Sequence, residues 1–529
     1  MTPSLHPLTR CCLTTLFALS VIACSSATRR PIFQLGLKVP SGSVADTSLP
    51  VSVTVAGCSS LPTLSLRHSG TEFKKVPFSG NPTSFVLTKE DIPFSRTGLA
   101  AKLVLSVQGT CTDGQTSTSL EQSVTFFPVA KVVSTPAGTI AAPELFYADG
   151  YATPPNPSTS FVGCQPKNDG GTSLVKTDTS GALIFSNDSL PFDCSLGSSF
   201  SAPRGPAGHR WMVEQGSPHG GAFSFDNTLK TYGGTLGQID SFGVLPDGNG
   251  IAGSVNPPDP ATFELTSTVF QIPGDNPLPA SWSQRIHGVV LASAAGTATQ
   301  VYFPHYYPGL PNEGLVGVQT LDTQGNLLND YPLLDNVQYH NDYGPALPPV
   351  AFSQDSSVIY FPSNAIGLTT TVVACRIPPQ GASSGCNGVN RVWQSVPLQG
   401  LALTLVPFGN GLLAVVCSQA TWILNIGNGK VIGQGILPDG ILTTGYFASG
   451  TQNDFYIMNG PAPSPNNPTP LPNEVVGVDS PTAGELFRYQ LATDTLSVAV
   501  DQGGQSWIRI GSQLIQPWPS SVYRKLLQQ

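Results

Sequence analysis

The chain has 529 residues, more than one ordinary hydrophobic core accommodates, so two or three domains are expected. Charged residues make up only 11%, hydrophobic residues 40%, and there are 55 Gly and 49 Pro, which indicates an all-β protein rich in turns and excludes a chain disordered by composition. The net charge of −8 argues against nucleic acid as a partner, because phosphate binding needs clustered basic residues.

An export signal is predicted at the N-terminus. Residues 1–24 carry Arg10 near their start and then an apolar run too short to span a bilayer, which ends in Val21-Ile22-Ala23-Cys24. This order resembles the lipobox of bacterial lipoproteins. The resemblance implies a cleaved signal peptide, a lipid on Cys24 that anchors the chain to a membrane, a tether over residues 25–31, and an outer-membrane location in the cell envelope. A secreted product of an ordinary signal peptide is the alternative.

Disulfide bonds are expected in the exported chain, since oxidising compartments favour them. The positions of the cysteines predict the pairs Cys58–Cys111, Cys164–Cys194 and Cys375–Cys386. Cys417 lies in an apolar run and is expected to be a buried free thiol. No Cys-x-x-Cys spacing supports a metal site, so none is predicted.

Residues 32–130 are predicted to form a small β-sandwich. Strand-like runs separated by turn residues are Phe33–Val39, Leu49–Ala56, Leu64–His68, Phe85–Thr88, Leu99–Gln108 and Ser123–Phe127. Short strands at this spacing resemble an immunoglobulin-like domain. In that topology the strands before Cys58 and Cys111 end at the same end of the sandwich, so a disulfide fits. A structural stalk is favoured over an adhesion module.

Residues 136–520 are predicted to form a β-propeller. A hairpin with Asp or Asn at its turn, as in Leu174–Ser186, returns along the chain. Its seven turn centres lie near Asp178, Asp226, Pro273, Asp322, Pro378, Asn425 and Ala492. Successive centres are 47 to 56 residues apart, and the last two are 67 apart. About 40 to 50 residues per four-stranded unit is typical of a propeller blade. Seven blades are therefore predicted, and the long last interval leaves room for an eighth.

The repeat resembles the PQQ-like, or quinoprotein-type, propeller repeat, in which a strand, an Asp-containing turn and a closing Trp follow one another. Phe185, Tyr232 and Tyr331 stand where most closing Trp residues would be. The resemblance implies the fold and not a chemistry. No cofactor is predicted, and PQQ and Ca²⁺ remain alternatives.

The C-terminal segment is expected to close the ring. Ser506–Trp518 is strand-like and is predicted to complete a blade that begins near Glu144–Tyr151, which leaves no free sheet edge. Val522–Gln528 is expected to form at most a turn.

Two aromatic segments, Tyr302–Tyr307 (YFPHYY) and Tyr339–Tyr343 (YHNDY), are predicted to be ligand-binding loops. The candidate residues are His305, Tyr306, Tyr307, Tyr339, His340, Asp342 and Tyr343. Tyr rings beside Asn, Asp and His suit sugar or peptide ligands, and packing between blades is the alternative. A metal or acid–base role for the histidines of this region is not favoured, since they share no fixed offset from the hairpin centres. They are His209, His219, His287, His305 and His340.

The predicted function is that of a cell-envelope lipoprotein acting as a binding or scaffold module, its propeller contacting protein or glycan. No Gly-x-Ser-x-Gly or His-Glu-x-x-His motif occurs, so a non-enzymatic role is favoured and no catalytic residue is assigned. The alternative is an exported propeller enzyme, a quinoprotein-like oxidoreductase or a glycan lyase or hydrolase, with its site at the axial channel. A third hypothesis, assembly of outer-membrane barrels, rests on the similar layout of propeller lipoproteins with that role.

Overall fold

The fold is known from a computed structural model. It describes residues 31–92, 101–134, 146–149, 160–166, 172–178, 182–189, 210–213, 220–223, 229–232, 238–274, 280–308, 314–339, 347–366, 369–378, 385–408, 411–436, 446–449, 455–459, 474–479, 481–490, 496–500, 506–510 and 513–527. Regular structure in these residues is almost entirely β, with one 3₁₀ turn, η1 (Gly388–Asn390), and one α-helix, α1 (Ser520–Leu527). None of the described helices is long and apolar enough to cross a membrane.

Two sheets that face each other form the N-terminal part, which we call the sandwich. The first has the order β1-β3-β6, with β1 (Gln34–Lys38), β3 (Leu49–Ala56) and β6 (Thr83–Leu87). The second has the order β2-β9-β7-β4-β5 with β8 beside β7, and comprises β2 (Gly42–Asp46), β4 (Thr63–His68), β5 (Thr71–Pro77), β7 (Ala101–Thr110), β8 (Thr116–Thr118) and β9 (Gln122–Pro128). Alternate residues of β3, such as Leu49, Val51 and Val53, are buried between the sheets, as the period of a half-buried strand requires.

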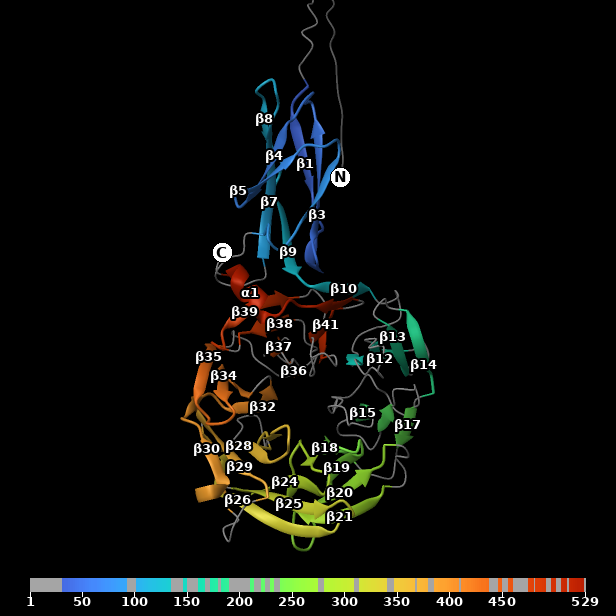
Figure 1. Cartoon of the computed structure of the whole chain (residues 1–529), viewed down its shortest axis with the longest axis vertical. Coiled ribbons are helices and arrows are strands. Elements are labelled where there is room, and N and C mark those ends of the chain that lie inside the picture. The colour runs from blue at the N-terminus through green and yellow to red at the C-terminus, as the bar shows by residue number, and fades with distance from the viewer. Residues whose placement is uncertain are drawn as a thin grey trace, which may run out of the picture.

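The remaining sheets lie around a centre and form a propeller-like ring (Figure 1). In order from the inner to the outer strand they begin with β11 (Phe146–Asp149), β12 (Ser160–Pro166), β13 (Thr172–Asp178) and β14 (Leu183–Asn187). Next come β15 (Arg210–Val213), β16 (Gly220–Phe223) and β17 (Leu229–Tyr232), then β18 (Ser241–Val244), β19 (Gly250–Val255), β20 (Thr266–Ile272) and β21 (Trp282–His287).

A ten-stranded sheet follows along the chain. It contains β22 (Val289–Val290), β23 (Ala295–Gly296), β24 (Gln300–Pro308), β25 (Gly314–Asp322), β26 (Leu327–Tyr339), β27 (Ala351–Phe352), β28 (Val358–Ile366), β29 (Thr369–Arg376), β30 (Arg391–Gln394) and β31 (Leu398–Gln399). All its pairings are antiparallel except the short one between β26 and β28.

Three further sheets complete the ring. Two are β32 (Ala402–Phe408), β33 (Leu412–Cys417), β34 (Ala420–Asn425) and β35 (Val431–Ile436), then β36 (Tyr446–Ser449), β37 (Phe455–Asn459), β38 (Glu474–Val478) and β39 (Glu485–Gln490). The third is β40 (Leu496–Val500), β41 (Ser506–Ile510), β42 (Gln513–Gln516) and β10 (Lys131–Ser134).

Six of the seven predicted hairpin centres lie between consecutive strands that pair with each other, and the seventh is wrong, because the strands before and after Ala492, β39 and β40, belong to different sheets. Leu174–Ser186 forms β13 and β14, and at its turn the carboxylate of Asp178 accepts the backbone N–H of Ala182 at 2.9 Å. Asp322 and Asn425 likewise accept backbone N–H groups at their own turns. These acidic and amide residues are therefore turn formers.

The ring is closed differently from the prediction. The C-terminal strands β41 and β42 do join an N-terminal strand, but their partner is β10, whose residues Lys131–Ser134 pair antiparallel with Gln513–Gln516. Phe146–Asp149 instead begins the next sheet as β11. The physical reason is that β10 follows β9 after only two residues and so enters the ring where the sandwich meets it.

The cysteine predictions hold for the described pairs. Cys58 and Cys111 form a disulfide in the sandwich, and Cys375 and Cys386 form one in the ring. Cys417 is free and buried, and burial raises its pKa to about 12. The third predicted pair, Cys164–Cys194, stays a prediction, because Cys194 lies outside the described residues.

A hydrophobic core joins the sandwich to the ring, and we call it the junction. Phe127 of β9 stacks against Tyr489 of β39 with ring centroids 5.1 Å apart, and against Tyr523 of α1 at 5.9 Å. Other buried members are Ala45, Val129, Val475, Leu486, Ile508, Ile515 and Leu526. The Tyr523 hydroxyl donates to the carbonyl of Pro128 at 2.8 Å and accepts the N–H of Trp518 at 3.1 Å.

Helix α1 corrects the expectation of a mere turn at the C-terminus. Its Tyr523 and Leu526 are buried in the junction, and the guanidinium of Arg524 pairs with the Asp479 carboxylate in the β38–β39 turn. A helix of eight residues is marginal by itself, so these contacts stabilise it.

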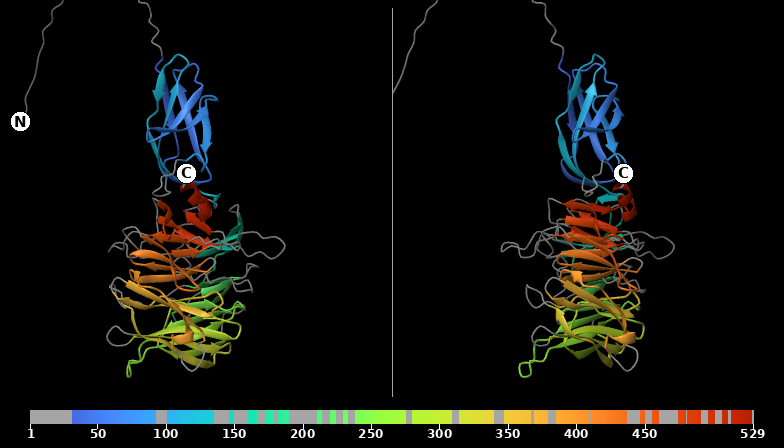
Figure 2. Two further views of the ribbon diagram at one scale, coloured as in Figure 1. Left: turned by 60° about the vertical axis from the view of Figure 1, so that its left-hand side comes forward. Right: turned by 90° about the vertical axis from the view of Figure 1, so that its left-hand side faces the viewer.

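The sandwich stands beyond the outer edge of the ring and covers neither of its faces (Figure 2). The chain enters the sandwich at the end away from the ring, because Gln34 pairs with Ala56 at the end of β3 while Asp46 and Phe127 lie at the junction.

Tryptophans in two outer strands lock neighbouring sheets together. The indole N–H of Trp393 in β30 donates to the carbonyl of Ile426 at 2.6 Å, and that of Trp282 in β21 donates to Thr323 at 3.0 Å. Both acceptors lie in the outer turn of the next sheet along the chain. Gly429 and Gly325 of those turns have positive φ and lie directly against the indole rings.

A Gly429→Ala substitution tests this lock, with Gly411→Ala as the matched control. Both glycines have positive φ (67° and 84°), so each alanine costs about 1 kcal/mol in backbone strain. A Cβ at Gly429 would lie 2.7 Å from Trp393 Cδ2, whereas at Gly411 the nearest neighbour, Ile426 Cγ2, is 3.5 Å away. We expect Gly429→Ala to lose about 1–3 kcal/mol more unfolding free energy in urea than Gly411→Ala. Equal losses would contradict the lock.

The junction is tested by Tyr523→Phe. This change removes one hydroxyl and leaves the buried Pro128 carbonyl and the Trp518 N–H without that partner, so a loss of about 1–3 kcal/mol is expected in urea unfolding. Tyr331→Phe is the control, because its hydroxyl accepts the amide N–H of exposed Asn329, and losing a hydrogen bond at an exposed residue costs less than about 0.5 kcal/mol. A Tyr523→Phe protein as stable as the control would show that the hydroxyl does not hold the junction.

Candidate functional site

The predicted aromatic loop Tyr302–Tyr307 is part of a strand. Every residue of β24 from Gln300 to Pro308 pairs with β25, so the prediction of a loop is wrong. The side chains alternate between the two faces of the sheet: Phe303 packs with the core toward β18–β21, and Tyr302 and Tyr306 with the core toward β28 and β29. Aromatic residues at such spacing fill the space between sheets.

Of the other predicted binding residues, Tyr306 and Tyr307 differ in burial. Tyr306 is buried, and burial raises its pKa, whereas Tyr307 at the strand end is 38% exposed. The backbone of Tyr339 ends β26 at the same end of the sheet, since Tyr307 pairs with Leu315 and Gly314 with Val337. The remaining predicted residues, His340, Asp342 and Tyr343, lie outside the described residues.

His305 is buried beneath this strand end, with 2% of its surface exposed. Its imidazole fits between two glycines: a Cβ at Gly317 would lie 2.6 Å from Nε2, and one at Gly288 would lie 3.0 Å from Cδ2. Nε2 is 3.5 Å from Oδ1 of Asp330, whose other oxygen accepts the Gln319 amide N–H at 2.7 Å. Strand register explains the contact, because glycine at 317 lets the His305 ring cross β25 toward β26.

Burial governs the charge of His305. Removal from water lowers its pKa, the nearby His287 lowers it further, and the Asp330 carboxylate opposes the shift. At neutral pH the imidazole is therefore neutral, and its partner is a half-exposed carboxylate held by Gln319.

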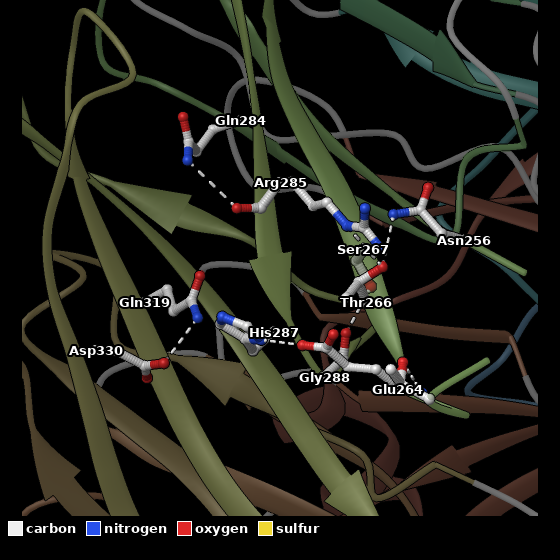
Figure 3. Close-up of polar contacts among 11 residues, drawn as sticks. Asn256, Glu264, Thr266, Ser267, Gln284, Arg285, His287, Gly288, Gln319 and Asp330 are labelled. Atoms are coloured by element: carbon white, nitrogen blue, oxygen red, sulfur yellow. Dashed lines mark hydrogen bonds and ion pairs between the residues drawn. The ribbon is translucent and has the colours of Figure 1, made fainter. Parts of the chain in front are cut away.

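His287 and Glu264, both labelled in Figure 3, form a second imidazole–carboxylate pair, and His287 is close enough to His305 to lower the pKa of His305. His287 Nδ1 is 2.6 Å from Glu264 Oε1. His287 ends strand β21, and Glu264 precedes β20, whose Thr266 pairs with His287. The backbone N–H of Gly288 donates to the Leu265 carbonyl at 2.8 Å and fixes this corner.

Phe263, next to Glu264, is 79% exposed and has a φ of 57°. An aromatic residue in this left-handed region is strained by about 1–2 kcal/mol. Asp259 holds the turn, since its carboxylate accepts the N–H groups of Ala261 and Thr262 and its carbonyl accepts that of Phe263 at 2.7 Å. The first two bonds lower the pKa of Asp259.

We call Phe263, Glu264, His287 and Tyr307 the surface cluster. Tyr307 joins it through Gly288, where a Cβ would be 3.3 Å from Tyr307 Cδ2. The four side chains come from the β19–β20 connection, the end of β21 and the end of β24, thus from two neighbouring sheets. The cluster combines an imidazole–carboxylate pair with two exposed aromatic residues, Tyr307 against Gly288 and Phe263 next to Glu264 in the sequence.

Sequence reasoning identified only Tyr307 of this cluster. The Asp259-Pro260 pair is a readable turn signal, but nothing in the sequence shows that the turn exposes Phe263. The histidines share no fixed distance in sequence from the hairpin turns. The reason is that His287 ends the outer strand of one sheet, whereas His305 lies on β24 of the next sheet. In the described part of the chain no three His, Cys, Asp or Glu side chains are arranged to hold a metal.

No protein-family model and no curated protein matches the chain. Among solved structures, it is similar to the computationally designed Ika8 protein, with a TM-score of 0.41 and 12% identity over 73% of this chain and 98% of that one. It is also similar to virginiamycin B lyase from Staphylococcus aureus, with a TM-score of 0.33 and 9% identity over 59% and 92%. A puromycin-hydrolysing peptidase from Mycobacterium tuberculosis gives 0.34 and 13% over 71% and 60%. At these TM-scores and sequence identities, no activity of these proteins can be assigned to this chain.

The charge state of His305 predicts a pH dependence of stability. Because the pKa is lowered in the fold, the unfolded chain, with a pKa of about 6.5, binds the proton first. The stabilisation is therefore complete above about pH 6.5 and is lost as the pH falls toward the folded pKa, with a slope of at most about 1.4 kcal/mol per pH unit.

Urea unfolding of the wild type and of His305→Gln between pH 7.5 and 5.5 measures this effect. We expect the variant to lose less unfolding free energy on acidification than the wild type does, because it lacks the buried imidazole. Parallel curves for the wild type and His305→Gln would contradict the assignment.

Proposed function

We propose that the chain is an exported, lipid-anchored binding protein of the cell envelope. In this proposal residues 1–24 are the signal peptide, 25–31 the tether, 32–130 an immunoglobulin-like stalk, and residues from 131 onward a propeller that contacts protein or glycan. The observation that carries it is the geometry of the sandwich, which the chain enters at the end opposite the ring.

That geometry suits a stalk. A lipid on Cys24 would lie ten residues before Gln34, at the far end of the sandwich. Strands of eight to ten residues at about 3.3 Å per residue then separate the ring from the tether by roughly 30 Å. The sandwich leaves both faces of the ring uncovered, so either face is available to a partner (Figure 2).

The described disulfides support export. The Cys58–Cys111 and Cys375–Cys386 bonds are of the kind that persists in oxidising compartments. The first lies at the tether end of the sandwich and so braces the part of the stalk nearest the membrane.

An immunoglobulin-like topology is supported by the strand order. In the second sheet β2 is parallel to β9, while β9, β7, β4 and β5 follow as antiparallel neighbours. The first sheet, β1-β3-β6, contributes three strands. The disulfide joins the residues that follow β3 and β7, one from each sheet.

Eight blades are favoured over seven by the pairing. The ten-stranded sheet divides naturally where β26 meets β28 in its single parallel contact, which gives one unit before and one after. The sheet β36–β39 fills the long interval between Asn425 and Ala492, and the sheet closed by β10 follows it as a separate unit.

Lipid anchoring is tested by Cys24→Ser, with Cys12→Ser as the matched control. Expressed in a Gram-negative host, the wild type is expected in the membrane fraction and to incorporate labelled palmitate, and Cys24→Ser to lose both. Cys12→Ser should behave as the wild type, because its residue is removed with the signal peptide. Retention of label and membrane association by Cys24→Ser would overturn the anchor.

A further inference from the structure

We propose that the surface cluster is a carbohydrate-binding site in which Phe263 and Tyr307 stack on sugar rings while Glu264 and His287 bind hydroxyl groups. This inference rests on the proposed binding function and names the ligand class and the site. It is argued from the geometry of the four side chains.

Phe263 is the first argument. A large aromatic side chain that is 79% exposed gains nothing from burial in the fold, and its φ of 57° adds strain. Three hydrogen bonds to Asp259 nevertheless hold the turn in this one conformation. A fixed turn that exposes an aromatic ring is preorganised for contact with a ligand. The entropy cost of ordering the turn is then part of folding and does not weaken binding.

The polar pair is the second argument. His287 uses Nδ1 for Glu264, which fixes both side chains relative to each other. The other imidazole nitrogen and the second carboxylate oxygen have no hydrogen-bond partner among the described residues. They are thus oriented and available to a donor and an acceptor on the ligand, and a sugar hydroxyl is both at once.

The composition of the cluster is the third argument. A pyranose ring presents an apolar C–H face, which suits the exposed rings of Phe263 and Tyr307, and a rim of hydroxyls, which suits the Glu264–His287 pair. A peptide bound as an added strand would need a row of backbone N–H and C=O groups along one sheet edge. The cluster instead presents side chains contributed by two sheets.

The layer beneath the cluster keeps it in place. Gly288 allows Tyr307 and His305 to lie close to the corner that carries His287, and any larger residue there meets both rings at 3.0–3.3 Å. The buried His305 and its partners Asp330 and Gln319 support the strand end from which Tyr307 projects.

The test is binding of the purified full-length protein to an array of immobilised neutral and acidic oligosaccharides. We expect the wild type to bind at least one class, and Phe263→Ala and Tyr307→Ala each to weaken that binding by about twofold to tenfold, as loss of one stacked ring implies. Val389→Ala removes a hydrophobic side chain that is 71% exposed elsewhere in the ring, and it should bind as the wild type does. Unchanged melting temperatures show that the variants fold.

Two results would overturn the proposal: binding to no oligosaccharide of the array, or equal binding by the wild type and a Phe263→Ala/Tyr307→Ala double variant. Glu264→Gln adds a readout that stacking alone does not give, because it is expected to weaken binding while both rings stay in place. The Cys24 experiment is independent of this one, so failure of glycan binding and failure of the envelope anchor are distinguishable.

Discussion

The pairing of β10 with β42 closes the ring and fixes the position of the sandwich next to it. Four residues, Lys131–Ser134, complete the last sheet of the ring with a strand from the beginning of the chain. Because β10 continues from β9 after two residues, the same segment ties the sandwich to the ring. The packing of Phe127 against Tyr489 and Tyr523 then buries the connection and adds helix α1 to it. The same short segment therefore closes the ring and attaches the sandwich to it.

The sequence predicts those features that follow from local periodicity. Hairpins are predictable because Asp178, Asp322 and Asn425 stand at turns between apolar runs. The Cys58–Cys111 disulfide follows from the expected strand order. Long-range partners leave no such local signal. β10 is a short run with two valines like many others, and α1 is stabilised because Tyr523 and Leu526 pack in a core that includes Ala45 and Phe127 from the sandwich. The hydrogen bond between Trp393 and the Ile426 carbonyl could not be predicted from the sequence, because Ile426 lies in a turn of the next sheet.

The candidate site shows the same division. The residue types of YFPHYY suggest binding, yet strand alternation buries Tyr302, His305 and Tyr306 and leaves only Tyr307 at the surface. The exposed Phe263 was not predicted, since exposure of an aromatic residue depends on a turn geometry that propensity does not encode. Its neighbours Glu264 and His287 meet only because the sheet pairs β20 with β21. Composition therefore suggested ligand-binding residues, and only the pairing of strands showed which side chains reach the surface.

We propose that packing at the junction makes the sandwich and the ring one rigid unit, so that the ring stays at a fixed distance from the N-terminal end of the sandwich. The most direct test is a distance distribution between spin labels introduced as unnatural amino acids at exposed Thr54 of β3 and exposed Gln434 of β35. A single narrow distribution is predicted for the wild type, and a broader one for Phe127→Ala, which removes the ring that stacks on Tyr489 and Tyr523. A broad distribution in the wild type, or one unchanged by Phe127→Ala, would contradict the claim.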